Sequence, residues 1–308
     1  MKKSAHHFQA LGVFLALIAL CLLFSITSSY FLTTENIFSV IRSFSFVAII
    51  ALGETFAILT GGIDLSVGSL LGFCGCVSAL AMNSQWAWPA AVLAGLLAGA
   101  FLGFCNGQLI TRLKLPPFIV TLGMYSMARG LTFVITRGWP VSNLPQGFMT
   151  LGQGYWWIVP LPVIFMILAG LAAGVFLNHT ATGRYLYALG GNETAASLSG
   201  IPVDRIKVLV YTLSGVASAV AGILLISRLG VAQPTSGVGY ELDAIAASVI
   251  GGTSLMGGKG TVLGVLIGAA IMGVLRNGLI LLGLSAFWQQ FALGAIIILA
   301  VAMDRFRK

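Results

Sequence analysis

A double glycine followed by an aspartate interrupts the apolar sequence within residues 53–69. The apolar runs on both sides are long enough to lie in lipid, so the break places irregular backbone and two carboxylates at or near membrane depth. Lipid offers backbone polar groups no partner, and such breaks are therefore tolerated only inside protein or beside water. Interrupted membrane helices often line transport pathways. We therefore expect this segment to lie beside such a pathway.

The composition indicates a protein that crosses the membrane many times. Of the 308 residues, 58% are hydrophobic and 8% are charged, whereas soluble domains carry about 25% charged residues. The net charge of +8 raises the alternative of a nucleic-acid partner, but the basic residues form no cluster of groove size. Basic loops on the cytoplasmic face of a membrane explain the charge better.

The apolar segments predict an all-α fold, a transmembrane helical bundle of about ten spans. We expect a single domain over residues 1–308, with some spans broken or re-entrant. The predicted segments are 10–26, 40–59, 65–81, 90–110, 117–135, 155–178, 204–226, 241–250, 262–275 and 287–303. The first could instead be a cleaved signal peptide, but its apolar run exceeds the ~7–15 residues usual there. A retained helix is therefore favoured.

The distribution of Lys and Arg predicts the orientation. An even number of spans places both termini on one side. That side then carries Lys2, Lys3, Arg112, Lys114, Arg184, Arg205, Lys207, Lys259, Arg305, Arg307 and Lys308. Fewer basic residues lie outside or within spans, namely Arg42, Arg129, Arg137, Arg228 and Arg276. Because basic loops mark the cytoplasm, both termini are predicted to be cytoplasmic, and the loops 137–154 and 228–240 external.

The polar segment 180–207 is expected on the cytoplasmic side, with one short helix over residues 193–199. Asn192 is a good N-cap, and Gly200 suits the position after a helix end. A plain solvated connector is the alternative. The length of the segment and its defined caps favour an element that docks a cytoplasmic partner.

Among the carboxylates, Glu54 alone lies deep in an apolar run by sequence. A charge at the centre of a membrane helix costs roughly 2.5–3.5 kcal/mol on insertion scales, so Glu54 must face a partner or a wet cavity. Structural and functional roles are both open for it. Asp64 is expected to cap the following helix rather than to contact substrate, and Asp204 to cap the span after the polar segment. One deep carboxylate without a buried histidine disfavours a proton-driven pump.

A second copy of the break occurs later in the chain. Residues 61–72 align with 257–268 at an offset of 196 (257 − 61), with five of twelve positions identical. Transporter folds often contain two related halves, so we interpret both copies as inward-facing hinges. The alternative is that these glycines serve only close helix packing, since glycine enters membrane helices freely.

No pattern in the sequence indicates catalysis or a metal site. The residues around Lys259 lack both the first glycine and the Ser/Thr of a phosphate-binding loop. Cys74 and Cys76 lack the second pair that a zinc site needs. We therefore predict that the chain is not an enzyme and holds no cofactor, with any ATP and Mg²⁺ bound by another polypeptide.

Several ordered motifs resemble the inner-membrane permeases of bacterial ABC importers for ribose and related sugars. They are residues 59–69, 183–193, 232–235, 239–247 and 251–260. The resemblance implies a homodimer or heterodimer of permeases, a pair of cytoplasmic ATPases and a periplasmic binding protein that delivers the sugar. It also implies that residues 183–202 couple to the ATPase and that the two external loops meet the binding protein.

These considerations give three sets of candidate residues. The predicted ATPase-coupling residues are Gly183, Arg184, Gly190, Gly191, Asn192, Glu193, Ser199 and Gly200. The predicted pathway and hinge residues are Glu54, Gly61, Gly62, Asp64, Gly257 and Gly258. The predicted binding-protein contacts are Trp139, Asn143, Gln233 and Thr235.

Two other functions compete with this prediction. A self-contained secondary transporter for a small polar solute is disfavoured by the scarcity of charge within the spans and by the structured inward segment. A membrane-embedded enzyme or scaffold is disfavoured because no catalytic constellation is present.

Overall fold

The computed structural model describes residues 2–306 as an α-helical protein with one two-stranded hairpin. The elements are α1 (Lys2–Thr27), α2 (Thr34–Leu59), α3 (Val67–Asn83), α4 (Trp88–Arg112), α5 (Pro117–Thr136), α6 (Gln146–Gln153), β1 (Tyr155–Trp156), β2 (Val159–Pro160), α7 (Leu161–His179), α8 (Ala181–Gly191), α9 (Glu193–Leu198), α10 (Val203–Leu229), α11 (Tyr240–Ile250), α12 (Val262–Leu281) and α13 (Ala286–Phe306). Arg307 and Lys308, which the charge distribution assigns to the inner side, lie outside the described residues.

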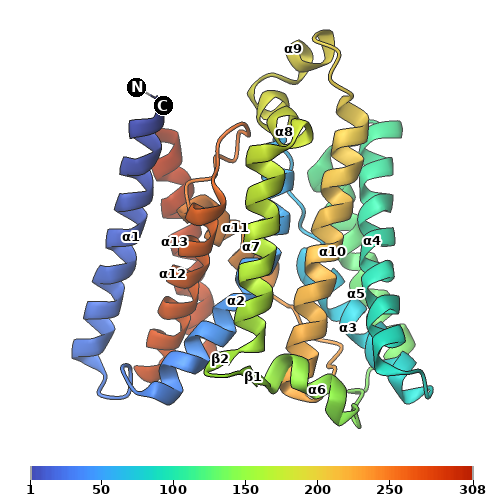
Figure 1. Ribbon diagram of the computed structural model, residues 1–308, viewed down its shortest axis with the longest axis vertical. Helices are drawn as coiled ribbons and strands as arrows, with labels where there is room; N and C mark the ends of the chain where they lie inside the picture. Colours follow the sequence, from blue (N-terminus) through green and yellow to red (C-terminus); the bar gives the residue numbers. More distant parts are fainter. Residues whose placement is uncertain (1, 307–308) are drawn as a thin grey trace.

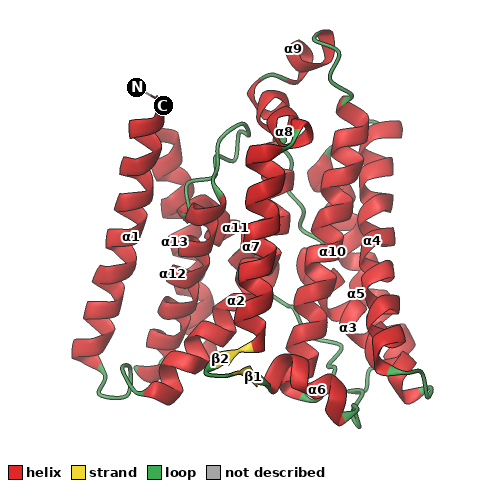
Figure 2. Cartoon of the chain, viewed as in Figure 1, coloured by secondary structure: helices red, strands yellow, loops and turns green. Residues whose placement is uncertain are grey.

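The long helices run side by side, and the two ends of the bundle differ (Figure 1). The helices α8 and α9 project at the end that holds both termini, while α6 and the hairpin lie at the other end. Figure 2 shows that helices make up nearly all of the regular structure. Among the described residues, α2, α4, α5, α7, α10 and α12 are each long and apolar enough to cross a membrane. The all-α polytopic fold is thus confirmed.

The second half of α2 forms the centre of the fold. Every residue from 45 to 59 is buried, including Glu54. A helix that is apolar on all sides lies either in a protein core or in lipid, and here α10 and α12 both pack against α2. On its other side α10 meets α4, where a Cβ at Gly99 or at Gly215 would contact backbone of the opposite helix. Small residues allow this close approach between membrane helices.

Two segments predicted to be loops contain helices that were not predicted. Segment 137–154, predicted to be external, contains α6, because Phe148 is fully buried and Ser227 Oγ donates to its carbonyl at 2.7 Å. Residues 155–160, assigned to a span, form the hairpin instead, and α7 begins only at Leu161. Segment 180–207, predicted to be cytoplasmic, contains α8 as well as α9, since Leu186 and Leu189 form a buried stripe three residues apart.

The predicted helix ends were right at α9 and wrong at two aspartates. The side chain of Asn192 accepts a hydrogen bond from Ala195 N at 2.9 Å, and Gly200 has φ +80°. By contrast, Asp204 lies inside the first turn of α10, whose N-cap is Pro202. Asp64 does not cap α3 either, because the cap position is Ser66 and Asp64 precedes it. Asp64 instead belongs to a buried hydrogen-bonded network.

Candidate functional site

The two breaks predicted from the sequence meet in the structure. The carbonyl oxygen of Leu59, the last residue of α2, accepts a hydrogen bond from the amide of Gly258 at 3.0 Å. Gly61 and Gly257 occupy equivalent positions in the two copies and have φ of +80° and +85°. Left-handed backbone is readily available only to glycine. The helices that follow the two breaks, α3 and α12, begin at Val67 and Val262. These starts are 262 − 67 = 195 residues apart, one less than the offset of the repeat.

Helix α8 sits directly on this junction. A Cβ at Gly190 would collide with the carbonyl oxygen of Leu59 and the amide of Gly258. Tyr187, one turn earlier, donates its hydroxyl to the carbonyl of Gly260 at 3.0 Å. Burial raises the pKa of the Tyr187 phenol, so it keeps the proton that it donates. Of the residues predicted for coupling, Gly190 and Gly191 therefore lie against the predicted hinge residues Gly257 and Gly258.

Below the junction, the chain between α2 and α3 turns back toward the middle of the bundle. The amide of Asp64 donates to Glu54 Oε1 at 3.0 Å. Glu54 lies 59 − 54 = 5 residues before the end of α2, which is about 7.5 Å along a helix. The start of α3 is therefore inside the protein, as the break predicted.

A buried polar network holds this inner start of α3. Asp64 Oδ1 accepts from the amide of Ser66 at 3.0 Å and from its hydroxyl, and Asp64 Oδ2 accepts from Ser214 Oγ of α10 at 2.8 Å. Asn106 of α4 donates to Ser66 Oγ at 3.0 Å. The sequence prediction missed Ser66, Ser214 and Asn106. Polar side chains inside apolar helices often form hydrogen bonds to other helices. The presence of Ser214 and Asn106 in apolar runs of the sequence could therefore have indicated this network.

Glu54 is only partly engaged by this network. Its Oε2 has no hydrogen-bond partner among the described residues, and neither has the buried hydroxyl of Tyr211. Tyr211 borders the break, since a Cβ at Gly62 would meet its hydroxyl. No ion pair forms between Glu54 or Asp64 and a basic group of the described chain. The observed role of Glu54 is to accept the amide that begins the inner turn.

Glu54 is not the only deep carboxylate, contrary to the sequence prediction. Asp64 is 0% exposed and Asp243, near the start of α11, is 3% exposed. Asp243 pairs with Arg276 of α12, whose Nη2 lies 2.8 Å from Oδ2. The signal for this pair was the presence of opposite charges in two neighbouring apolar runs, because a charge within a membrane normally requires a partner.

The predicted binding-protein contacts lie together on the surface. Trp139, Asn143, Gln233 and Thr235 are all exposed. Their two loops are joined by an antiparallel bridge in which Val141 N donates to Ala232 O at 2.8 Å and Ala232 N donates to Val141 O at 2.9 Å. These two loops, both predicted to be external, therefore present one continuous surface.

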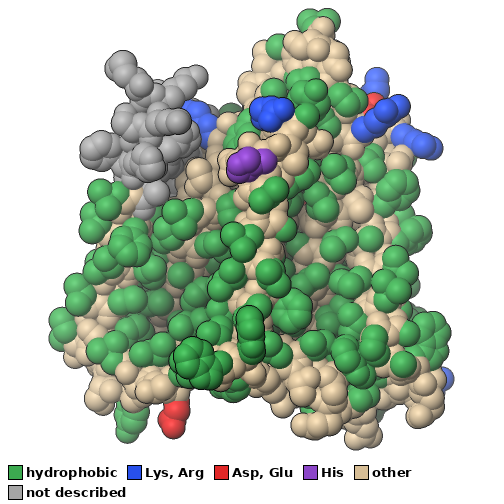
Figure 3. Space-filling view, in the orientation of Figure 1, with side chains coloured by type: hydrophobic (Ala, Val, Ile, Leu, Met, Phe, Trp, Pro, Cys, Tyr) green, Lys and Arg blue, Asp and Glu red, His purple; other side chains and the backbone are tan. Residues whose placement is uncertain are grey.

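The opposite end presents α9 as its outermost element (Figure 1). In α9 only Ala196 is buried, and Leu198 is 85% exposed. Glu193 pairs with Lys207 of α10 at 2.6 Å, which ties α9 to the bundle. Most of the Lys and Arg side chains visible in Figure 3 gather at this end.

Known proteins similar to this chain are transport permeases. The family model for the branched-chain amino acid transport system permease component matches residues 36–301. The ribose import permease protein RbsC of Bacillus subtilis is 48% identical over 96% of this chain and 93% of its own length. The proteins of that name from Escherichia coli K12 and Haemophilus influenzae are 46% and 45% identical over 94% and 99% of this chain, and over 92% and 98% of their own lengths.

No solved structure matches the chain significantly. The family model covers most of the sequence, and the relatives align over nearly its full length. The chain belongs to the family of permease components of the branched-chain amino acid transport system type.

Proposed function

We propose that this chain is the transmembrane permease of an ATP-binding cassette importer for a ribose-like monosaccharide. The observation that carries the proposal is the 48% identity to a ribose import permease over 96% of the chain. In this function the chain carries the sugar pathway and does not hydrolyse ATP. The ATP and Mg²⁺ are bound by separate cytoplasmic ATPase subunits, and a periplasmic binding protein delivers the sugar.

The geometry supports a route for coupling. ATP binding by the partner subunits pushes on α9 and thereby on α8. Because Gly190 of α8 touches both Leu59 and Gly258, this displacement reaches the two breaks together. The helices then rock between inward-open and outward-open arrangements, as transporters with broken helices do. Neutral sugars need small polar groups and backbone in such a pathway rather than strong charge.

The proposal includes a topology. Ten helices, including the short α3 and α11, correspond to the ten predicted segments. The chain lies in the bacterial inner membrane as one domain, with both termini, α8 and α9 in the cytoplasm and the loops around Trp139 and Gln233 in the periplasm. The gathering of basic side chains at the α8–α9 end supports this orientation. A second permease copy, identical or homologous, completes the membrane part.

The decisive experiment measures ATP hydrolysis by the complex of permease, ATPase and binding protein reconstituted in lipid, over a panel of monosaccharides. Ribose or a close analogue should stimulate hydrolysis and accumulate in proteoliposomes. If no sugar stimulates hydrolysis or accumulates, the proposed function is wrong. Uptake by the permease alone under an ion gradient would support a secondary transporter instead.

A further inference from the structure

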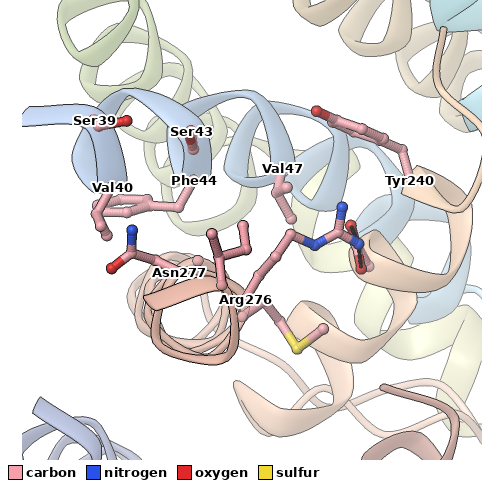
Figure 4. A pocket seen from close by; sticks show the side chains of 12 residues that line it. Ser39, Val40, Ser43, Phe44, Val47, Tyr240, Arg276 and Asn277 are labelled. Carbon is pink, nitrogen blue, oxygen red and sulfur yellow. Dashed lines mark hydrogen bonds and ion pairs between the residues drawn. The ribbon is translucent and has the colours of Figure 1, made fainter. Parts of the chain in front are cut away.

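A cavity of about 280 Å³ lies between α2, α11 and α12. Figure 4 shows Ser39 and Ser43 on α2, Tyr240 on α11, and Arg276 and Asn277 on α12 around it. These residues lie toward the end of the bundle opposite α8 and α9, where α2 begins and α12 ends (Figure 1). Small-molecule sites start at about 300 Å³ and combine apolar walls with a few convergent polar groups.

The ion pair in this cavity is placed asymmetrically. Arg276 Nη2 donates to both oxygens of Asp243, at 3.0 and 2.8 Å. The Asp243 side chain is 4% exposed, whereas that of Arg276 is 38% exposed. The carboxylate is therefore enclosed, while the guanidinium reaches the cavity with N–H groups that Asp243 does not use. An ionised pair within a membrane segment is expensive and usually serves function.

Two hydroxyls of the lining are not committed to the protein. Ser39 Oγ and Tyr240 Oη take part in no hydrogen bond with the described residues. Apart from Arg276, the other polar side chains of the lining already have partners in the protein. Ser43 Oγ accepts from Arg228 Nη1 at 3.0 Å, and the Asn277 amide exchanges hydrogen bonds of 2.7 and 3.1 Å with Asn36.

The rest of the lining is apolar. Phe44, Val47 and Met272 form the wall between the polar groups. A monosaccharide presents the complementary surface, because its ring carries hydroxyl groups around the edge and C–H groups on its faces. The hydroxyls both donate and accept, as the free Ser and Tyr hydroxyls and the guanidinium require. The charges of Asp243 and Arg276 cancel, so the lining has no excess charge that favours an ion.

We propose that this cavity is a binding subsite for a neutral monosaccharide, in which Ser39, Tyr240 and Arg276 hold the sugar hydroxyls. The proposal rests on the proposed function and extends it, because it assigns the sugar a resting place on the permease itself. The position near the end opposite α8 and α9 makes the subsite the first one that a sugar released by the binding protein reaches.

The test measures equilibrium binding of radiolabelled D-ribose to the permease–ATPase complex in nanodiscs, without binding protein. The double variant Ser39→Ala with Tyr240→Phe removes two hydroxyls that have no protein partner. It should weaken ribose binding about tenfold or more, as expected for two lost hydrogen bonds. Arg276→Gln should abolish binding. The matched control is Ser126→Ala with Tyr30→Phe, which alters exposed residues elsewhere and should leave binding unchanged.

Sugar uptake by the complete importer is measured in parallel. If the wild-type importer takes up no sugar, the proposed function is wrong, and the subsite with it. If uptake is normal but ribose does not bind the complex, or binds all variants equally, only the subsite is refuted. Displacement of ribose by inorganic phosphate would also refute it, since the site would then select anions.

Discussion

The amide of Gly258 donates a hydrogen bond to the carbonyl oxygen of Leu59 at 3.0 Å, and this bond joins the two interrupted segments of the chain. Leu59 ends α2, and Gly258 lies in the loop between α11 and α12. The same two groups flank Gly190 of α8. A single contact therefore connects the helix proposed to receive the ATPase movement with both breaks in the membrane helices.

The first prediction concerns the contact at Gly190. Gly190→Ala inserts a methyl group against the Leu59 carbonyl and the Gly258 amide, and overpacking of this kind costs about 1–3 kcal/mol. The substitution should separate α8 from the junction, so that ATP hydrolysis continues while sugar uptake in proteoliposomes falls at least severalfold. Gly174→Ala in α7 is the matched control, because nothing lies within 4 Å of an added Cβ there. If both variants took up sugar at the same rate, the contact of Gly190 with Leu59 and Gly258 would have no role in coupling.

A second prediction tests the attachment of α8 by Tyr187. Tyr187→Phe removes the hydrogen bond to the Gly260 carbonyl, which should weaken the attachment by about 1 kcal/mol. Amide hydrogen exchange in residues 181–191 should become severalfold faster, as followed by mass spectrometry. Tyr185→Phe, at an exposed position of the same helix, should leave exchange unchanged. Unchanged exchange in Tyr187→Phe would exclude the hydrogen bond as an anchor.

Local sequence features predicted the elements that depend on local chemistry. The apolar runs gave the long helices, because burial in lipid requires length and hydrophobicity at each position. The caps at Asn192 and Gly200 gave α9 within one residue. The glycines at the breaks were also visible, since backbone with positive φ restricts the residue type at Gly61 and Gly257.

Contacts between distant segments were beyond sequence patterns. Ser214 lies 214 − 64 = 150 positions from its partner Asp64, and nothing in the spacing pairs them. Helix α8 was missed because its polar composition resembles a loop, although Leu186 and Leu189 are buried. The meeting of Gly190 with Leu59 likewise results from packing of α8 on α2.

A third prediction decides whether Glu54 needs its charge. Its Oε1 accepts from the amide of Asp64, and no basic side chain of the described residues pairs with it. Glu54→Gln keeps the acceptor, so sugar uptake should stay within about twofold of wild type. Glu54→Ala leaves the buried amide without a partner, which costs about 1–3 kcal/mol and should lower the thermal midpoint in detergent.

The control for Glu54 is Glu35→Gln, at an exposed position near the start of α2, which should change neither property. Loss of uptake in Glu54→Gln, with normal amounts of folded protein, would show that the carboxylate charge takes part in transport. In that case the hydrogen bond to Asp64 would be only part of the role of Glu54.

The fourth prediction concerns docking by α9. Leu198 is 85% exposed at the end of this helix, and burying a Leu side chain at an interface contributes about 1.5–3 kcal/mol. Leu198→Asp should therefore weaken binding of the ATPase subunits about 10- to 100-fold, since 1.4 kcal/mol corresponds to tenfold. Replacement of residues 191–199 by a flexible linker should abolish it. Copurification of ATPase with the tagged permease measures both effects.

Leu284→Asp is the matched control for this docking test. It makes the same change at an exposed leucine in the turn between α12 and α13, so ATPase binding should be retained. Labelling of single cysteines in the loops reports whether each variant inserts normally. Because α9 buries only Ala196 against the rest of the protein, its loss should not disturb the spans. A linker variant that inserts normally and still transports sugar would exclude α9 as the coupling element.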